Sequence, residues 1–218
     1  AVIGSTGSGK STLVKLMNRF YDVSRGSIEI NGVDIRKYNL ESLRTQIGYV
    51  AQKAHMFKGS IQSNICFGKP EASVEEMVHA ATVAQASDFI STREHGYEDE
   101  IAEDGTNISG GQKQRLSIAR VILKKPSLYI YDDSFSALDF KTDATLRKAL
   151  KPEVKNAIFF VVAQRISTIM DSDMIIVLDE GQIIGMGTHA QLLKDCSVYQ
   201  EIAHSQLTQK ELDDYERN

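Results

Sequence analysis

The chain has 218 residues, 42% of them hydrophobic, and its 25 basic and 29 acidic residues give a formal net charge of −4. This length and composition allow a sizeable core, and the lack of a basic excess argues against a charge-driven nucleic-acid binder. The two cysteines, Cys66 and Cys196, lie far apart and the five histidines are scattered, which argues against a zinc site and favours a reducing compartment. No stretch approaches the roughly 20 apolar residues that a membrane-spanning helix needs.

The chain begins with an apolar run, Ala1–Ile3, directly before a glycine-rich segment. This run predicts the end of a buried strand, and because a strand is normally longer, we expect the natural protein to extend upstream. A helix is predicted from about Lys10 to Phe20. Ser27–Ile35 then alternates apolar and polar residues around Asn31-Gly32, which predicts a hairpin with a tight turn.

Further along the chain, short apolar runs alternate with helical patterns. Four runs predict buried strands: Ile47–Ala51, Leu128–Tyr131, Ala157–Ala163 and Met174–Leu178. Residues from about Pro70 to Lys125 are predicted to be helical, with one capping box formed by Ser73 and Glu76 and a second by Ser109 and Gln112. This alternation is typical of a parallel α/β sheet into which a helical block is inserted.

Gly4–Ser11 matches the phosphate-binding pattern G-x-x-x-x-G-K-[ST] in full. Its glycines let successive backbone N–H groups point at phosphate oxygens, and the following helix presents its N-terminus to the same anion. Lys10 is expected to reach the β and γ phosphates, and the Ser11 hydroxyl to ligate Mg²⁺. The predicted cofactors are ATP and Mg²⁺, and the predicted binding residues are Gly4, Ser5, Thr6, Gly7, Ser8, Gly9, Lys10, Ser11 and Thr12.

The apolar strand at Leu128–Tyr131 is followed by Asp132 and Asp133. An enzyme with a phosphate loop needs a carboxylate at such a strand end to hold Mg²⁺ and its waters, and we assign this role to Asp132. An acidic loop after a strand is the ordinary alternative, which the phosphate loop in the same chain makes less favourable.

The predicted fold is therefore α/β: a P-loop NTPase core with a mainly parallel sheet, a small antiparallel hairpin region and an inserted helical subdomain. The predicted divisions are residues 1–69 and 126–204 for the two parts of the core, 70–125 for the helical subdomain and 205–218 for a polar tail.

Residues 108–115, with the sequence ISGGQKQR, resemble the LSGGQ signature of ABC transporter ATPases, with Ile108 in place of leucine. In this family two such subunits pack head to tail around two ATP molecules. The resemblance implies that Ser109, Gly110, Gly111 and Gln112 form a second phosphate-binding site, which closes on ATP held by the partner subunit.

The resemblance extends over nearly the whole chain. Gln52 resembles the family's Q-loop residue, which touches Mg²⁺ and senses the transmembrane partner, and Ser136–Asp139 resembles the loop that crosses the dimer interface. Asp99–Gly105 is similar to the acidic segment by which exporters meet their coupling helices, and Phe57–Ile65 is also exporter-like. The implied metal ligands are Ser11, Gln52 and Asp132, and the implied catalytic residues are Asp133, Gln164 and Gln52.

The resemblance also implies two parts of the protein that would lie outside residues 1–218. The aromatic residue that stacks on adenine and the transmembrane domain of an exporter are both expected upstream of Ala1. The implied location is the cytoplasmic face of the cell membrane, within an integral membrane transporter, and no nucleic-acid partner is implied.

Two residues depart from the family pattern. Asp133 stands where the family has glutamate as general base, and Gln164 stands where it has a histidine that contacts the γ-phosphate. An aspartate reaches about 1 Å less far, which can cost about 10²-fold in rate, and a glutamine cannot carry a positive charge. Neutral drift in a working ATPase is one explanation; the other is a degenerate site in one subunit of a heterodimeric exporter.

Two further functions fit part of the pattern. A nucleotide-gated interaction module would bind ATP and dimerise with negligible turnover, and the changes at Asp133 and Gln164 suit such behaviour. A chromosome-maintenance or repair ATPase shares the signature, but it would carry long coiled-coil insertions, and no sustained heptads occur here.

Overall fold

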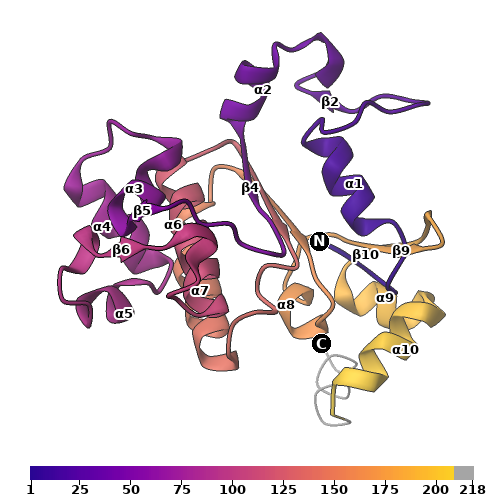
Figure 1. The fold of residues 1–218 in the computed structure, drawn as a ribbon. Coiled ribbons are helices and arrows are strands. Elements are labelled where there is room, and N and C mark those ends of the chain that lie inside the picture. Colours follow the sequence, from indigo (N-terminus) through magenta and orange to yellow (C-terminus); the bar gives the residue numbers. More distant parts are fainter. Residues whose placement is uncertain (209–218) are drawn as a thin grey trace. The chain divides into compact units, whose positions relative to one another are not determined.

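A computed structural model describes residues 1–208 of the chain. These residues form two compact units. The first unit consists of Ala1–Arg36 together with the described residues from Phe160 onward, and the second consists of Lys37–Phe159. Figure 1 shows the helices and strands of both units and labels most of them. Each unit combines parallel strands with helices, which confirms the predicted α/β class.

The first unit contains the phosphate loop. Its elements are β1 (Val2–Gly4), α1 (Lys10–Met17), β2 (Glu29–Ile30), β3 (Val33–Asp34), most of β8 (Ile158–Val162), α8 (Ile166–Ile169), β9 (Ile175–Asp179), β10 (Gln182–Gly187), α9 (His189–Asp195) and α10 (Ser197–Gln206).

Strand β1 pairs in parallel with β9 on one side and with β8 on the other. Val2 and Ile3 are 0% and 1% exposed, as expected for a strand that is covered on both faces. Strand β10 runs antiparallel to β9. Because parallel strands end at the same edge of a sheet, the segments that follow β1, β8 and β9 gather there.

The second unit contains the signature helix and the acidic strand end. Its elements are α2 (Leu40–Gln46), β4 (Ile47–Val50), β5 (Gly59–Ser60), α3 (Ile61–Ile65), α4 (Val74–Val83), α5 (Ser87–Ser91), β6 (Glu100–Ile101), α6 (Gly110–Lys124), β7 (Leu128–Asp132) and α7 (Phe140–Glu153).

Helix α6 forms the core of the second unit by packing against α3, α4 and β4. Leu116 and Ile118 are both 0% exposed, so they contribute their full apolar area to this core. Strand β4 pairs in parallel with β7, from Ile47 opposite Leu128 to Val50 opposite Tyr131. This pairing brings the residues after β4 to the edge at which β7 ends in its aspartates.

Most of the predicted elements are present. The hairpin forms as β2 and β3, with Asn31 and Gly32 at φ 52° and 76° in its turn. Both predicted capping boxes are made in full. The first helix ends at Met17 rather than Phe20. The side-chain amide of Asn18 donates to the Val14 carbonyl at 2.9 Å, and Arg19 adopts a left-handed backbone conformation, which ends the helix.

The prediction that residues from about Pro70 to Lys125 are helical was wrong between α5 and α6. There β6 pairs antiparallel with β5, and Gly96 and Gly105 adopt φ 56° and 65°. Glycine takes up these left-handed conformations without steric cost and interrupts helical order.

The predicted domain divisions stay a prediction. Residues 70–125 lie within the second unit, and α10 includes Ser205 and Gln206 of the predicted tail; residues 209–218 lie outside the described residues. Across residues 1–208, no helix has the length and hydropathy needed to cross a membrane.

Candidate functional site

The phosphate loop begins at Gly4, where β1 lies very close to the backbone of β9. A Cβ atom at Gly4 would lie 2.0 Å from the Leu178 carbonyl oxygen, so only glycine fits at the end of this strand. Gly9 caps α1 with φ 102°, a left-handed conformation that costs other residues more. No side chain caps α1, and its first turn has no acidic residue, which leaves the positive end of the helix open to an anion.

The ammonium group of Lys10 lies inside the loop. Its Nζ donates to the carbonyls of Gly4 and Ser5, both at 2.7 Å, and to the Ser8 hydroxyl at 3.2 Å. The cation is thus held by the loop's own oxygen atoms at the N-terminus of α1. Phosphate oxygens would provide stronger, charge-assisted partners in the same place.

Gln164 reaches the same edge of the first unit from a neighbouring strand. The N–H of Ala163 donates to the Val2 carbonyl at 3.1 Å, so β8 runs alongside β1 to its end. Gln164 follows directly and is exposed. At the end of β9, the Asp179 carboxylate accepts a 3.3 Å hydrogen bond from the Ser5 hydroxyl. The structure therefore brings Gln164 and the phosphate loop to one edge of this sheet.

The corresponding edge of the second unit carries two buried carboxylates. Asp132 and Asp133 are 6% and 8% exposed. Gln52 donates from Nε2 to Asp133 Oδ2 at 3.0 Å, and the Tyr49 hydroxyl donates to Asp132 Oδ2 at 3.4 Å. Each carboxylate at the end of β7 is thus contacted by a residue of β4 or the loop after it.

Tyr49 is a hydrogen-bond donor at neutral pH. Burial, and then the nearby charge of Asp132, raise the pKa of its hydroxyl to about 12. Because the phenol stays protonated, it favours the ionised form of the carboxylate it contacts. Tyr49 was not predicted as a site residue, since a tyrosine in a buried strand looks like an ordinary core side chain.

The signature segment forms the N-terminus of α6. The Ser109 hydroxyl accepts from the N–H of Gln112, and the Gln112 side chain accepts from the N–H of Ser109. A Cβ at Gly111 would lie 3.4 Å from the Ala137 carbonyl, whereas a Cβ at Gly110 would meet nothing within 4 Å. The first turn of α6 has no acidic residue, so Gly110 presents open space at a helix N-terminus.

A buried glutamine ties the signature helix to the segment that carries Gln52. Gln114 is 1% exposed, and its amide donates to the Ala51 carbonyl at 3.1 Å. Gln114 belongs to the signature string, but the sequence indicates no role for it, because its partner lies 63 residues away.

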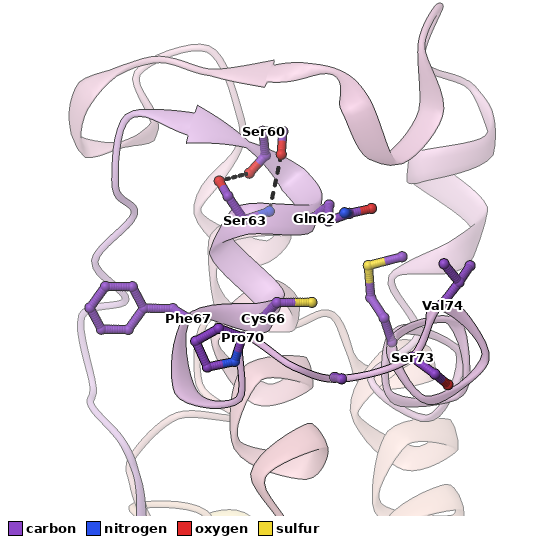
Figure 2. Close-up of a pocket in the computed structure, with 10 residues that line it drawn as sticks. Ser60, Gln62, Ser63, Cys66, Phe67, Pro70, Ser73 and Val74 are labelled. Atoms are coloured by element: carbon purple, nitrogen blue, oxygen red, sulfur yellow. Dashed lines mark hydrogen bonds between the residues drawn. The ribbon is translucent and has the colours of Figure 1, made fainter.

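A separate pocket of about 460 Å³ lies between α3, the turn after it and α4 (Figure 2). On one side of it, Ser63 makes two hydrogen bonds to Ser60, of 3.0 and 2.8 Å. The pocket adjoins the predicted exporter-like segments, because β6 pairs with β5 and the N–H of Ile61 donates to the Asp99 carbonyl at 3.0 Å.

The predicted metal ligands Ser11, Gln52 and Asp132 offer oxygen atoms of a hydroxyl, an amide and a carboxylate. Such hard donors suit Mg²⁺, which also retains several waters and phosphate oxygens in nucleotide sites. Residues 1–208 contain no cluster of three or more His, Cys, Asp or Glu side chains that could hold a metal without further ligands. The assignment of the three ligands stays a prediction.

Comparison with known proteins gives one family. The profile described as ABC transporter matches residues 1–136, more than half of the chain. An ABC transporter ATP-binding protein of Mycobacterium tuberculosis (strain ATCC 25618 / H37Rv) is 46% identical over 209 residues, which cover 94% of this chain and 36% of that protein. A Bacillus subtilis (strain 168) protein, named as a multidrug export ATP-binding/permease protein, is 46% identical over 202 residues, covering 93% and 35%.

A solved structure is similar over the same extent. The chain matches a bacterial Atm1-family ABC exporter with ATP bound at a TM-score of 0.91 and 38% identity, covering 94% of this chain and 36% of that one. The chain therefore spans about a third of the length of these relatives.

Proposed function

This chain belongs to the ABC transporter family, and on that premise we propose that it is the ATP-binding and ATP-hydrolysing part of a membrane exporter. The observation that carries the proposal is the complete phosphate loop, in which Lys10 Nζ lies between loop oxygens at the open N-terminus of α1. We propose that the rest of the protein includes a transmembrane domain and that this chain lies at the cytoplasmic face of the cell membrane.

In the proposed site, the backbone N–H groups of the phosphate loop bind and orient the phosphates of ATP. Lys10 exchanges its loop acceptors for oxygens of the β and γ phosphates. Ser11, Gln52 and Asp132 would hold Mg²⁺, which neutralises charge on the phosphates when bound. Asp133 would orient the attacking water, and Gln164 would donate a hydrogen bond to the γ-phosphate.

The signature segment is proposed to act on the ATP of a second subunit packed head to tail. Ser109 caps the N-terminus of α6, whose first turn carries no acidic residue, and a Cβ at Gly110 would meet open space there. A phosphate brought to this end by a partner would meet backbone N–H groups and the positive end of the helix dipole.

We further propose that this chain's own site turns over slowly. Asp133 is one methylene shorter than glutamate, and a misplacement of about 1 Å can cost about 10²-fold in rate. Gln164 can hold the γ-phosphate but cannot supply positive charge. The partner subunit would carry glutamate and histidine at these positions, and ATP there would be hydrolysed against Ser109–Gln112 of this chain.

The surface around the 460 Å³ pocket is the proposed contact with the transmembrane part. The adjacent segment Asp99–Gly105 has four acidic residues among its seven, which suits a basic or polar helix end on the other side. This assignment rests on the exporter-like sequence of both segments.

The second candidate function is a nucleotide-gated interaction module with negligible turnover, which Asp133 and Gln164 favour. Phosphate release by the assembled full-length complex separates the two functions, since only a transport ATPase shows sustained, substrate-sensitive turnover.

ATP binding tests both candidate functions. Lys10→Ala should weaken binding to the full-length protein markedly, whereas Lys15→Ala, an exposed lysine on the same helix, should not. Equal ATP affinity for wild type and Lys10→Ala would show that the phosphate loop does not bind ATP.

A further inference from the structure

Helix α10 ends in Gln206, whose side chain makes two hydrogen bonds to the loop after β8. Its Oε1 accepts from the N–H of Ile166 at 2.8 Å, and its Nε2 donates to the carbonyl of Gln164 at 2.8 Å. The partners lie 40 and 42 residues away in the sequence. One planar amide therefore holds the backbone on both sides of a single residue, Arg165.

The backbone of this loop needs such a partner. Ile166 is the first residue of α8, and its N–H cannot bond within the helix. The N-cap residue, Arg165, does not cap the helix with its side chain, because arginine has donors but no acceptor. Gln206 supplies the missing acceptor from another helix and, with the same amide, engages the carbonyl of Gln164.

Gln206 is itself held in place by the anchoring of α10. Tyr199 and Ala203 on this helix are both 0% exposed. The Tyr199 hydroxyl lies 2.7 Å from Nδ1 of His189 on α9, and α10 also packs against α8. The end of α10 is therefore tied to the packed part of the first unit, and it restrains the exposed loop at Gln164.

We propose that Gln206 is a positioning residue that aims Gln164 at the γ-phosphate of ATP in the phosphate loop. The inference rests on the proposed ATP site. Gln164 follows β8 at the edge where β1 leads into the phosphate loop, so its direction depends on the backbone that Gln206 holds. Through these two hydrogen bonds, ATP binding becomes sensitive to the position of α10.

The experiment compares ATP with ADP binding to the full-length protein, by competition against a fluorescent nucleotide. If the protein is a heterodimer, the partner's phosphate-loop lysine is replaced first, so that only this chain's site is measured. Gln206→Ala should weaken ATP binding by about 3- to 10-fold, which corresponds to one hydrogen bond. ADP lacks the γ-phosphate, so its affinity should stay unchanged.

Two variants separate positioning from a general structural effect. Gln206→Glu keeps the acceptor for Ile166 but loses the donor to Gln164, and it should lower the ratio of ATP to ADP affinity. Gln200→Ala is the matched control on the same helix, where the amide donates to the carbonyls of Leu193 and Lys194 at 2.7 and 3.2 Å; it should leave that ratio unchanged.

The effect should also pass through Gln164. Gln164→Ala should reproduce the loss of ATP affinity, and adding Gln206→Ala to it should cause no further loss. Parallel losses of ATP and ADP affinity, additive losses in the double variant, or an unchanged ratio in both Gln206 variants would each overturn the inference. Failure of Lys10→Ala to weaken ATP binding would instead contradict the proposed function, which keeps the two tests distinct.

Discussion

The side-chain amide of Gln52 donates a 3.0 Å hydrogen bond to the carboxylate of Asp133, a residue 81 positions further along the chain. The parallel pairing of β4 with β7 makes this contact possible, because both residues follow the carboxyl ends of these strands. Asp133 has φ 48°, a left-handed conformation that aspartate adopts more readily than most residues. The carboxylate is therefore buried, held by Gln52, and limited to the reach of an aspartate.

If this chain's own site turns over slowly, as proposed, Asp133→Gln should lower overall ATPase activity only modestly. A carboxylate about 1 Å out of place can lose about 10²-fold in rate, so little turnover is expected through this site. The matching Glu→Gln change in a heterodimer partner should nearly abolish activity. The measurement is steady-state phosphate release from the purified full-length complex, with each subunit changed in turn.

The reciprocal experiment restores the family residues. Asp133→Glu together with Gln164→His should raise hydrolysis at this site, because the base gains reach and the second residue gains the ability to carry charge. If Asp133→Gln lowers ATPase activity as much as Glu→Gln in the partner does, this chain's site is an ordinary catalytic one. The proposal that it turns over more slowly than the partner's site would then be wrong.

Signature variants are expected to act on the partner's ATP rather than on this chain's own. Ser109→Arg places a bulky side chain at the N-terminus of α6, and Gly110→Asp adds an acid where a Cβ meets open space. The arginine side chain would block the close approach of the partner's ATP, and the added aspartate would repel its phosphates. Either change should therefore abolish turnover at the partner's site.

Two assays on the assembled complex check this prediction. Phosphate release reports turnover, and nucleotide binding with the partner's phosphate-loop lysine replaced reports this chain's own site, which should be unaffected. Unchanged turnover in both variants would show that Ser109 and Gly110 do not complete the competent site.

Tyr49→Phe should weaken the binding of Mg²⁺ at the site that includes Asp132. It removes the hydroxyl that lies 3.4 Å from Asp132 Oδ2 and leaves the ring in place. This hydrogen bond is long and hence weak, so we expect about a 2- to 3-fold rise in the Mg²⁺ concentration that gives half-maximal ATP binding at this chain's own site. The measurement is a Mg²⁺ titration of nucleotide binding to the full-length protein, with the phosphate-loop lysine of any heterodimer partner replaced.

Tyr131→Phe provides the matched control in the adjacent strand. The Tyr131 hydroxyl is buried and has no hydrogen-bond partner among the described residues. Its removal should leave the Mg²⁺ dependence unchanged and raise the free energy of unfolding by about 1 kcal/mol, since a buried unsatisfied group is lost. Equal Mg²⁺ titrations for Tyr49→Phe and wild type would rule out a role for Tyr49 at the metal site.

Gly48→Ala should destabilise the second unit. A Cβ at Gly48 would lie 2.5 Å from a methyl carbon of Val121 and 2.6 Å from Cγ of Pro126. Because the proline ring cannot move aside easily, we expect a loss of about 1–3 kcal/mol from overpacking. Thermal unfolding of the full-length protein measures it, with Gly68→Ala as control, where the nearest atoms lie at 3.9 Å. Equal melting temperatures for the two variants would contradict the tight packing at Gly48.

Features that depend on residues adjacent in the chain could be predicted from the sequence. The phosphate loop, the capping boxes at Ser73 and Ser109 and the Asn31-Gly32 turn were all predicted, because each rests on a few consecutive side chains and on glycine's conformational freedom. The buried strands were predicted within about a residue at each end, since runs of apolar residues mark them directly. The strand within the predicted helical block was missed because its two residues, Glu100 and Ile101, are too few to show a period.

The contacts of the candidate site residues, in contrast, depend on how distant parts of the chain pack together. Gln52 meets Asp133, Tyr49 meets Asp132 and Gln206 meets Gln164 across separations of 81, 83 and 42 residues. The first two contacts follow from the pairing of β4 with β7, and the third from the packing of α10 beside α8. Strand order and helix packing are set by the burial of whole apolar faces, so no short pattern around Gln206 or Tyr49 could have indicated their partners.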